Sequence, residues 1–266
     1  MACIAADGTH RLVNRMRLIK QVAGTIFFIY AILLFVATML VIFIPVWMTT
    51  LFSEPRRSKL LHPIFKAWMG VYLPLVFCPV IRKGKKHFKK GKNYVVVVNH
   101  NSLADIPVSS PWIPGPNKTL AKVEMAKIPV FGVIYKAGSL LLDRKKESSR
   151  RESFQKMQQM LDLGLHLCLY PEGTRNKTDK PLQNFYDGAF ITAIRSQKPI
   201  IPALIFNTKR IYPAIKSKFW ATPMPIYIHF LEPVSTEGLT LNDTAALKER
   251  IHQMMESYYV ANGKKA

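Results

Sequence analysis

The longest apolar stretch of the chain runs from residue 22 to residue 47 and contains no charged side chain. As a single helix it would be about 39 Å long, which exceeds the ~30 Å hydrocarbon core of a bilayer. A tilted spanning helix fits this stretch, and so do two short helices that dip into one leaflet. Both flanks are basic, which leaves the topology open but favours both ends on the cytoplasmic side. The pattern therefore predicts attachment to a membrane.

A second apolar stretch, residues 67–80, contains Pro74 and Pro79, so we expect it to lie at an interface or to pack on the protein rather than to span. We accordingly divide the chain into a membrane-anchoring helical segment with basic flanks, residues 1–66, and an α/β domain, residues 67–266. A cleaved signal peptide is not expected, because the apolar run is too long and no small-residue cleavage site follows it promptly.

From residue 94 onward, short apolar runs alternate with amphipathic stretches. The apolar runs predict strands at 94–98, 139–143, 165–170, 199–206 and 226–234. The amphipathic stretches predict a helix from Ser102, as its N-cap, to a point before Pro114, one over 148–164 that ends at Gly164, and one over 245–260. Strands separated by helices predict an α/β fold with a central mixed sheet flanked by helices.

The charge of the chain is unevenly placed. There are 38 lysines and arginines against 16 acidic residues, a net charge of +22, yet Glu54 is the only acid between Asp7 and Asp105. Cations that flank apolar sequence favour anionic lipid head groups, at roughly 1 kcal/mol for each cation near the surface. A solvated basic face is the alternative. Nucleic acid is not an expected partner, since the sequence has neither zinc-finger spacing nor an aromatic RNA-binding signature.

The three cysteines, Cys3, Cys78 and Cys168, are odd in number and far apart, which argues against a disulfide framework and favours a reducing compartment. His166 and Cys168 would share one face of a strand and could be considered as metal ligands. Two ligands without others at suitable spacing fall far short of a zinc signature, so core packing is the expected role of this pair.

Polar residues follow the valine run directly, in the stretch NHNSLAD at 99–105. Ligands of open α/β sheets gather beyond the carboxyl ends of strands, where His100 is expected to lie. If Asp105 lies in the first turns of the next helix, its carboxylate can fold back to the imidazole. That contact would hold one tautomer, leave the other ring nitrogen free as a base and stabilise the imidazolium. The alternative is a loop histidine with a purely structural hydrogen bond and an aspartate that stabilises a helix start.

A second polar cluster lies in the stretch YPEGTR, residues 170–175. Pro171 would break the preceding strand and Gly173 would let the backbone turn. The turn would display three polar residues at the same sheet edge as His100: Glu172, Thr174 and Arg175. The planar fork of a guanidinium suits bidentate recognition of phosphate. A tight surface turn with a solvated ion pair is the alternative interpretation.

Four stretches resemble the four sequence blocks of the glycerolipid, or lysophospholipid, acyltransferases in order and approximate spacing. They are NHNSLAD (99–105), GSLLLDR (138–144), YPEGTR (170–175) and IIPALI (200–205). The chain is similar in particular to bacterial 1-acyl-sn-glycerol-3-phosphate acyltransferases. The resemblance covers roughly residues 90–210 together with the membrane-associated N-terminus, so residues 67–266 would form an acyltransferase domain. The third block begins with Tyr170, where phenylalanine is frequent in the family.

The resemblance implies transfer of a fatty acyl chain from acyl-CoA or acyl-acyl carrier protein to the free sn-2 hydroxyl of lysophosphatidate, which gives phosphatidate. It implies that His100 is the general base and that Asp105 orients it. The residues that it implies for binding the glycerol phosphate are Arg144, Glu172, Gly173, Thr174 and Arg175. Lys122 either adds positive charge there or is a solvated lysine. Neither a cofactor nor a metal is implied, and the chain has no G-x-S-x-G nucleophile motif.

Several alternatives stay open at this point. The acceptor could be another lysophospholipid, glycerol 3-phosphate or a lyso-ornithine lipid. A membrane-associated thioesterase or lysophospholipase would use His100 to activate water, and a non-catalytic lipid-binding protein would share only the fold. The arginines favour a phosphorylated acceptor, and the presence of both His100 and Asp105 favours catalysis. The expected location is the cytoplasmic face of the inner (plasma) membrane, at an anionic bilayer surface.

Overall fold

The computed structural model describes residues 2–142, 147–212 and 220–263, with side chains described from residue 15 to 142, from 151 to 212 and from 220 to 263. Its strands are β1 (Val80–Lys83), β2 (Val95–Val98), β3 (Asn117–Lys122), β4 (Ser139–Leu142), β5 (His166–Leu169), β6 (Ile200–Phe206) and β7 (Ile226–Phe230). Its helices are α1 (Ala2–Thr49), α2 (Arg56–Leu75), α3 (Asp105–Trp112), α4 (Phe131–Gly138), α5 (Glu147–Asp162), α6 (Gly188–Ser196), α7 (Thr208–Ile211) and α8 (Thr244–Asn262). Three short 3₁₀ helices are η1 (Lys85–His87), η2 (Val123–Lys127) and η3 (Leu241–Asp243).

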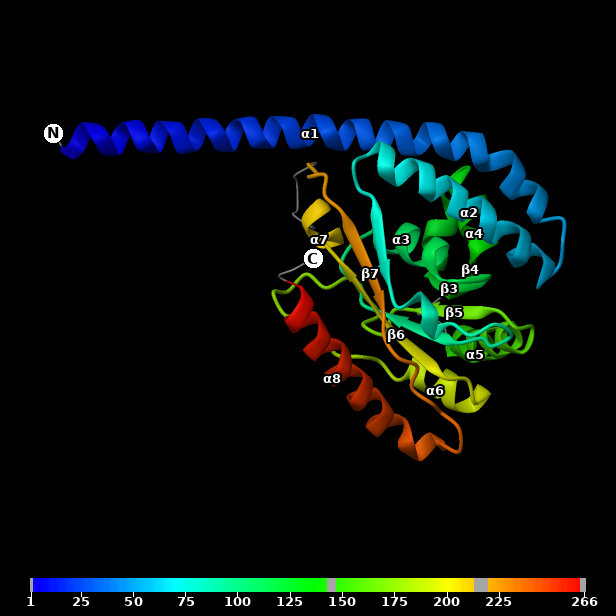
Figure 1. Cartoon of the computed structure of the whole chain (residues 1–266). Coiled ribbons are helices and arrows are strands. Elements are labelled where there is room, and N and C mark those ends of the chain that lie inside the picture. The colour runs from blue at the N-terminus through cyan, green and yellow to red at the C-terminus, as the bar shows by residue number, and fades with distance from the viewer. Residues whose placement is uncertain (1, 143–146, 213–219, 264–266) are drawn as a thin grey trace.

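The strands form one seven-stranded sheet in the order β1-β7-β6-β2-β5-β3-β4 (Figure 1). β6 and β7 are antiparallel, and the other neighbouring pairs are parallel. The sheet is therefore mixed and helices flank it, which confirms the predicted fold class. Because β6, β2, β5, β3 and β4 run in the same direction, their carboxyl ends meet at one edge of the sheet.

The central strand β2 shows how the two layers of helices are built. Val96 and Val98 pack in a cluster with residues of α1, α2, α3 and α4, whereas Val95 and Val97 pack with residues of α5, α6 and α8. Successive side chains of a strand point to opposite faces, so a run of valines is suited to a strand that is covered on both faces. All four valines are fully buried.

Most predicted elements form close to their predicted positions, with two corrections. Ser102 does not cap α3, because the helix begins at Asp105 and the Ser102 hydroxyl accepts a hydrogen bond from Ala104 N–H at 3.3 Å. β7 ends at Phe230, four residues earlier than predicted; beyond it, Leu231 N–H still donates to the Pro202 carbonyl at 2.8 Å, and Val234 forms an isolated bridge with Ile200. Gly164 follows α5 with a φ of +81°, the left-handed conformation predicted for its C-terminal cap.

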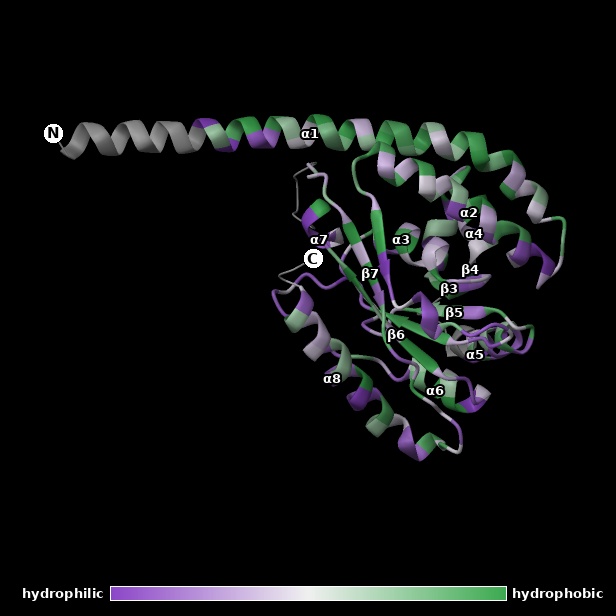
Figure 2. Cartoon of the chain, viewed as in Figure 1, coloured by the Kyte–Doolittle hydropathy of each residue, from purple (hydrophilic) through white to green (hydrophobic). Residues whose placement is uncertain are grey.

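The apolar N-terminal stretch forms part of one continuous helix, α1, rather than two short helices. Among the described residues, 15–49 form one helix that is long and apolar enough to cross a membrane, and only 6% of its most apolar window is buried. Figure 2 shows hydrophobic residues along most of this part of α1, and Figure 1 shows its N-terminal half extending past the body of the protein.

The second apolar stretch packs on the protein as the C-terminal part of α2. Three side-chain hydrogen bonds join α1 and α2 into a hairpin: Trp68 Nε1 to Thr38 Oγ1 at 2.9 Å, the Tyr72 hydroxyl to the Ala31 carbonyl at 3.2 Å, and the Tyr30 hydroxyl to the Leu75 carbonyl at 3.1 Å. The division of the chain at residue 66 stays a prediction, although α2 crosses that boundary without a break.

A buried ion pair ties this hairpin to the sheet. Lys118 of β3 is 2% exposed, and its Nζ lies 2.7 Å from Glu54 Oε1 in the connection between α1 and α2. The other oxygen of Glu54 accepts hydrogen bonds from the Ser58 N–H at 3.2 Å and the Ser58 hydroxyl at 2.6 Å, and Lys118 also donates to the Ala137 carbonyl at the end of α4. Desolvation lowers the pKa of Lys118, and the nearby carboxylate of Glu54 only partly offsets this shift.

We expect Lys118→Met to lower the free energy of unfolding by about 3 kcal/mol, because it leaves the Glu54 carboxylate without its main partner in a poorly solvated position. The double variant with Glu54→Gln should recover part of this loss, because it leaves no unpaired charge in this poorly solvated position. Urea or thermal unfolding in detergent would measure both effects. Lys122→Met, which replaces an exposed lysine on the same strand, is the control. Equal unfolding midpoints for all variants would contradict this role of the ion pair.

Candidate active site

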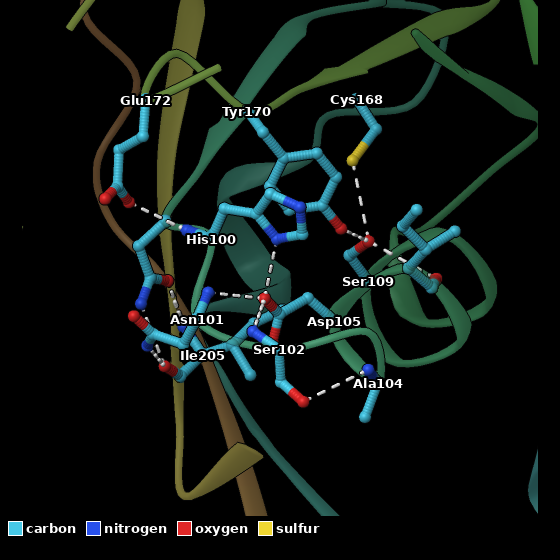
Figure 3. A network of polar contacts seen from close by, with 12 residues as sticks. His100, Asn101, Ser102, Ala104, Asp105, Ser109, Cys168, Tyr170, Glu172 and Ile205 are labelled. Atoms are coloured by element: carbon cyan, nitrogen blue, oxygen red, sulfur yellow. Dashed lines mark hydrogen bonds and ion pairs between the residues drawn. The ribbon is translucent and has the colours of Figure 1, made fainter. Parts of the chain in front are cut away.

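The predicted contact between His100 and Asp105 forms directly after β2. His100 Nδ1 lies 2.8 Å from Asp105 Oδ2, and the Asp105 side chain is fully buried whereas that of His100 is 16% exposed (Figure 3). Asp105 is the first residue of α3, so its carboxylate folds back over the loop that carries the histidine. With the Nδ1 proton donated to the carboxylate, Nε2 holds the free lone pair and can act as a base.

The loop between β2 and α3 owes its shape to the same carboxylate. Asp105 Oδ2 also accepts the backbone N–H of Asn101 at 2.6 Å and that of Ser102 at 2.7 Å. Asn99, at the start of the loop, bonds the neighbouring strand: its amide donates to the Ile205 carbonyl at 3.0 Å, and its Oδ1 accepts the Ile205 N–H at 2.7 Å. The loop is thus held at both ends, by β6 and by Asp105. The sequence pattern did not single out Asn99.

The third block holds the backbone of His100 rather than only lying beside it. The His100 N–H donates to Glu172 Oε1 at 2.8 Å, and the Asn176 N–H donates to the His100 carbonyl at 2.6 Å. The second oxygen of Glu172 accepts the Gln183 N–H at 3.0 Å. Glu172 was predicted to be displayed at the sheet edge, but its side chain is 1% exposed and both carboxylate oxygens face backbone.

Burial gives Glu172 an unusual protonation equilibrium. Desolvation raises the pKa of its carboxyl from an ordinary value of 4.5 to about 7, and the negative charge of Asp105 adds to the shift. The N–H groups of His100 and Gln183 oppose the shift because they stabilise the ionised form. The carboxyl group that accepts the His100 N–H can therefore change its charge near neutral pH.

A cavity of about 1140 Å³ lies at this edge of the sheet. His100 lines it, as do the predicted binding residues Lys122, Gly173, Thr174 and Arg175. Much of its wall is apolar and comes from α1 and α2, including Phe27, Phe35, Phe65 and Trp68. Gly173 has a φ of +66°, which favours glycine at this turn. The cavity is therefore lined by His100, by two cationic side chains and by many apolar ones.

Three positions that the sequence analysis considered need separate mention. Arg144 lies outside the described residues. His166 and Cys168, considered above as metal ligands, are both buried and make other contacts: the His166 ring packs against Tyr94 and Phe88, with centroids 5.7 Å and 5.4 Å away, and Cys168 contacts Ser109. No group of three or more potential metal ligands gathers anywhere in the described part of the chain.

Comparisons with known proteins bear on what this site does. Residues 80–206 match the family model described as Acyltransferase. The chain is 32% identical over 175 residues to human 1-acyl-sn-glycerol-3-phosphate acyltransferase alpha, a match that covers 65% of this chain and 61% of the human protein. It is 26% identical over 195 residues to the 1-acyl-sn-glycerol-3-phosphate acyltransferase of Haemophilus influenzae, covering 73% of this chain and 79% of that protein. The chain thus spans less than two thirds of the human relative.

The fold also has a solved counterpart. The crystal structure of the 1-acyl-sn-glycerophosphate (LPA) acyltransferase, PlsC, from Thermotoga maritima superimposes with a TM-score of 0.72 and 22% sequence identity. The match covers 91% of this chain and 95% of that one, so it includes the N-terminal helices as well as the sheet. At this identity the likeness establishes a shared fold.

Because folding raises the pKa of Glu172, the folded protein binds this proton more tightly than the unfolded chain does. The contribution of this residue to stability should therefore be complete below about pH 4.5 and should fall as the pH rises to about 7, by up to about 3 kcal/mol. Unfolding curves of the wild type and Glu172→Gln over this range should diverge by that amount. Glu237→Gln, an exposed glutamate, serves as the control, and parallel curves for Glu172→Gln would show that burial leaves this carboxyl unperturbed.

Proposed function

We propose that this chain, whose residues 80–206 match the Acyltransferase family model, transfers a fatty acyl chain from a thioester to the sn-2 hydroxyl of lysophosphatidate, giving phosphatidate. The observation that carries this proposal is the His100–Asp105 pair at a cavity that is lined by many apolar side chains and by the cations Lys122 and Arg175. An acyl chain suits the apolar wall, and a phosphate suits the cations.

The proposed chemistry is general base catalysis without a covalent acyl-enzyme. His100 Nε2 removes the proton of the acceptor hydroxyl as its oxygen attacks the thioester carbonyl. The tetrahedral intermediate then expels the thiolate, which takes the proton back from the imidazolium. Asp105 stabilises the imidazolium in the interval and keeps Nδ1 protonated throughout. A positioned base of this kind contributes typically 10²–10⁴-fold to the rate.

The proposed binding roles follow the placement of each side chain. Arg175 and Lys122 line the cavity and would bind the phosphate of the acceptor, with Gly173 and Thr174 beside them; Arg144 of the second block would join them. Glu172 would act indirectly, since its carboxylate holds the backbone of His100. The donor would be acyl-CoA or acyl-acyl carrier protein, and the thioester supplies the driving force, so the proposed reaction requires neither cofactor nor metal.

His100→Ala should abolish formation of phosphatidate, with a loss in kcat of at least about 10²-fold, because the variant lacks the proposed base. The assay would contain lysophosphatidate and long-chain acyl-CoA in detergent or liposomes, with acyl-acyl carrier protein as a second donor, and would quantify both phospholipid and free fatty acid. His87→Ala, a partly exposed histidine in η1, is the matched control. Thioester consumption that yields only fatty acid would instead indicate a thioesterase.

We further propose that α1 lies in the plane of the membrane rather than across it. The body of the protein contacts α1 from Gly24, whose carbonyl accepts the Ala221 N–H at 3.0 Å, to Val46, which is fully buried. This contact runs for roughly 33 Å at 1.5 Å per residue, as long as the hydrocarbon core is thick. A perpendicular helix would draw α2 and the segment around Ala221 into the bilayer. The outer face of α1 would then lie in one leaflet, on the cytoplasmic side.

An in-plane helix places both of its ends on the same side of the membrane. Single cysteines at Arg15 and at Lys59, introduced with Cys3 replaced by serine, should therefore react with a membrane-impermeant maleimide from the same side of oriented vesicles. The native Cys78 and Cys168 are buried and provide the background. Labelling of the two positions from opposite sides would establish a spanning helix and would refute this arrangement.

A further inference from the structure

The ring of Tyr170 lies against the imidazole of His100. The two ring centroids are 4.5 Å apart and the ring planes are inclined by 34° (Figure 3). Tyr170 is the first residue after β5, and its ring is in the wall of the cavity that His100 also lines. The histidine is therefore held at one edge by Asp105 and supported on one face by an aromatic ring.

The hydroxyl of Tyr170 is itself held in place. Its oxygen lies 2.7 Å from Ser109 Oγ, and Figure 3 shows this contact on the side of the ring away from the histidine backbone. Ser109 Oγ also lies 3.5 Å from the Ile106 carbonyl and 3.6 Å from the Cys168 thiol, and either hydroxyl can be the donor of the bond between Tyr170 and Ser109. Desolvation raises the pKa values of both Tyr170 and Cys168, that of Cys168 to about 11, so both groups remain neutral.

Helix α3 supplies both supports of the imidazole. Asp105 and Ser109 are four residues apart and therefore lie on the same face of this helix, one turn from each other. Asp105 bonds Nδ1 directly, and Ser109 bonds the tyrosine on which the ring rests. Both side chains are fully buried, so neither is free to exchange its partner for water.

We propose that Tyr170 is a positioning residue for His100, and that its hydrogen bond to Ser109 sets the angle at which the imidazole presents Nε2 to the substrate hydroxyl. The Asp105 contact alone fixes one ring nitrogen but leaves rotation of the ring about that contact. The tyrosine ring limits this rotation, and the Ser109 bond limits movement of the tyrosine ring. This inference rests on the proposed function of His100 as the base.

The position differs from a generic aromatic site in one respect. A phenylalanine at residue 170 could support the imidazole, but it has no bond to α3 and can slide with β5. The hydroxyl makes the support move with the same helix that carries Asp105. Small displacements of a catalytic group cost rate steeply, since a shift of about 1 Å can lower it by about 10²-fold.

The first test compares Tyr170→Phe, Ser109→Ala and the double variant in the acyl-transfer assay. Each single change should lower kcat by about 5- to 20-fold and change KM for lysophosphatidate by less than about 2-fold, because substrate contacts remain while the base is misaligned. The double variant should be no worse than the worse single variant, since both changes remove the same hydrogen bond.

Tyr94→Phe is the matched control for loss of a buried tyrosine hydroxyl. The Tyr94 ring stacks on His166 with centroids 5.7 Å apart, and its hydroxyl accepts the Lys89 N–H at 3.2 Å. Tyr94 directly precedes β2 and His166 is the first residue of β5, so this pair lies at the amino ends of these strands, at the edge of the sheet opposite to His100. The control should lose stability as Tyr170→Phe does, yet keep the wild-type kcat.

The second test uses Tyr170→Leu, which removes the aromatic face. An aromatic face favours a neighbouring cation, so its loss should disfavour the imidazolium. The acid limb of the pH profile of kcat/KM should then move to lower pH by about 0.5 unit, in addition to a fall in kcat. Tyr170→Phe keeps the ring and should keep the wild-type limb. A purely structural role of residue 170 would move neither limb.

The outcomes separate this inference from the function on which it rests. If the wild type forms no phosphatidate, the proposed function fails, and the positioning role that rests on it fails with it. If the wild type is active and Tyr170→Phe and Ser109→Ala both retain its kcat, the positioning role is overturned. Thermal unfolding midpoints above the assay temperature for all variants would show that the comparison is made between folded proteins.

Discussion

The site depends on one buried carboxylate oxygen. Asp105 Oδ2 accepts three hydrogen bonds, from His100 Nδ1 and from the backbone N–H groups of Asn101 and Ser102. A carboxylate without water needs several donors to remain ionised, and the loop after β2 supplies them within five residues. The loop cannot take another path without leaving this charge unsatisfied. The orientation of the histidine and the shape of the loop are therefore the result of the same constraint.

Distant parts of the chain then hold this loop from outside. Asn99 bonds β6, and Glu172 and Asn176 bind the two backbone groups of His100. These contacts join the first, third and fourth blocks through backbone atoms rather than through side-chain pairs. In this arrangement the side chains of Asn99 and Glu172 and the backbone of Asn176 hold the loop that carries His100.

The N-terminal hairpin contributes the apolar half of the same cavity. Its aromatic side chains face the space beside His100, and its own position is set by the Glu54–Lys118 pair and by the backbone bond between Gly24 and Ala221. The hairpin is thus a wall of the site, and in the proposed arrangement its outer face is also the surface that meets the membrane. A lipid acceptor in the membrane would then be close to the base without leaving an apolar environment, which is consistent with the proposed reaction.

The sequence by itself determined the features that depend on local pattern. The valine run predicted a buried strand, because β-branched residues favour strands. The apolar stretch predicted attachment to a membrane but left one helix or two open. The stretch NHNSLAD allowed a contact between His100 and Asp105 on the condition that Asp105 lies in the first turns of the next helix. The strands β1 and β3 were not predicted. VIRK is short, and NKTLAK contains polar residues. One of them, Lys118, is buried because it pairs with the distant Glu54. Only the tertiary structure decided that Glu172 is buried against the backbone of His100, that Ser109 holds Tyr170, and that α1 lies along the body. Each of these contacts joins residues far apart in the sequence, and their distance in space is set by strand order and packing rather than by any local period.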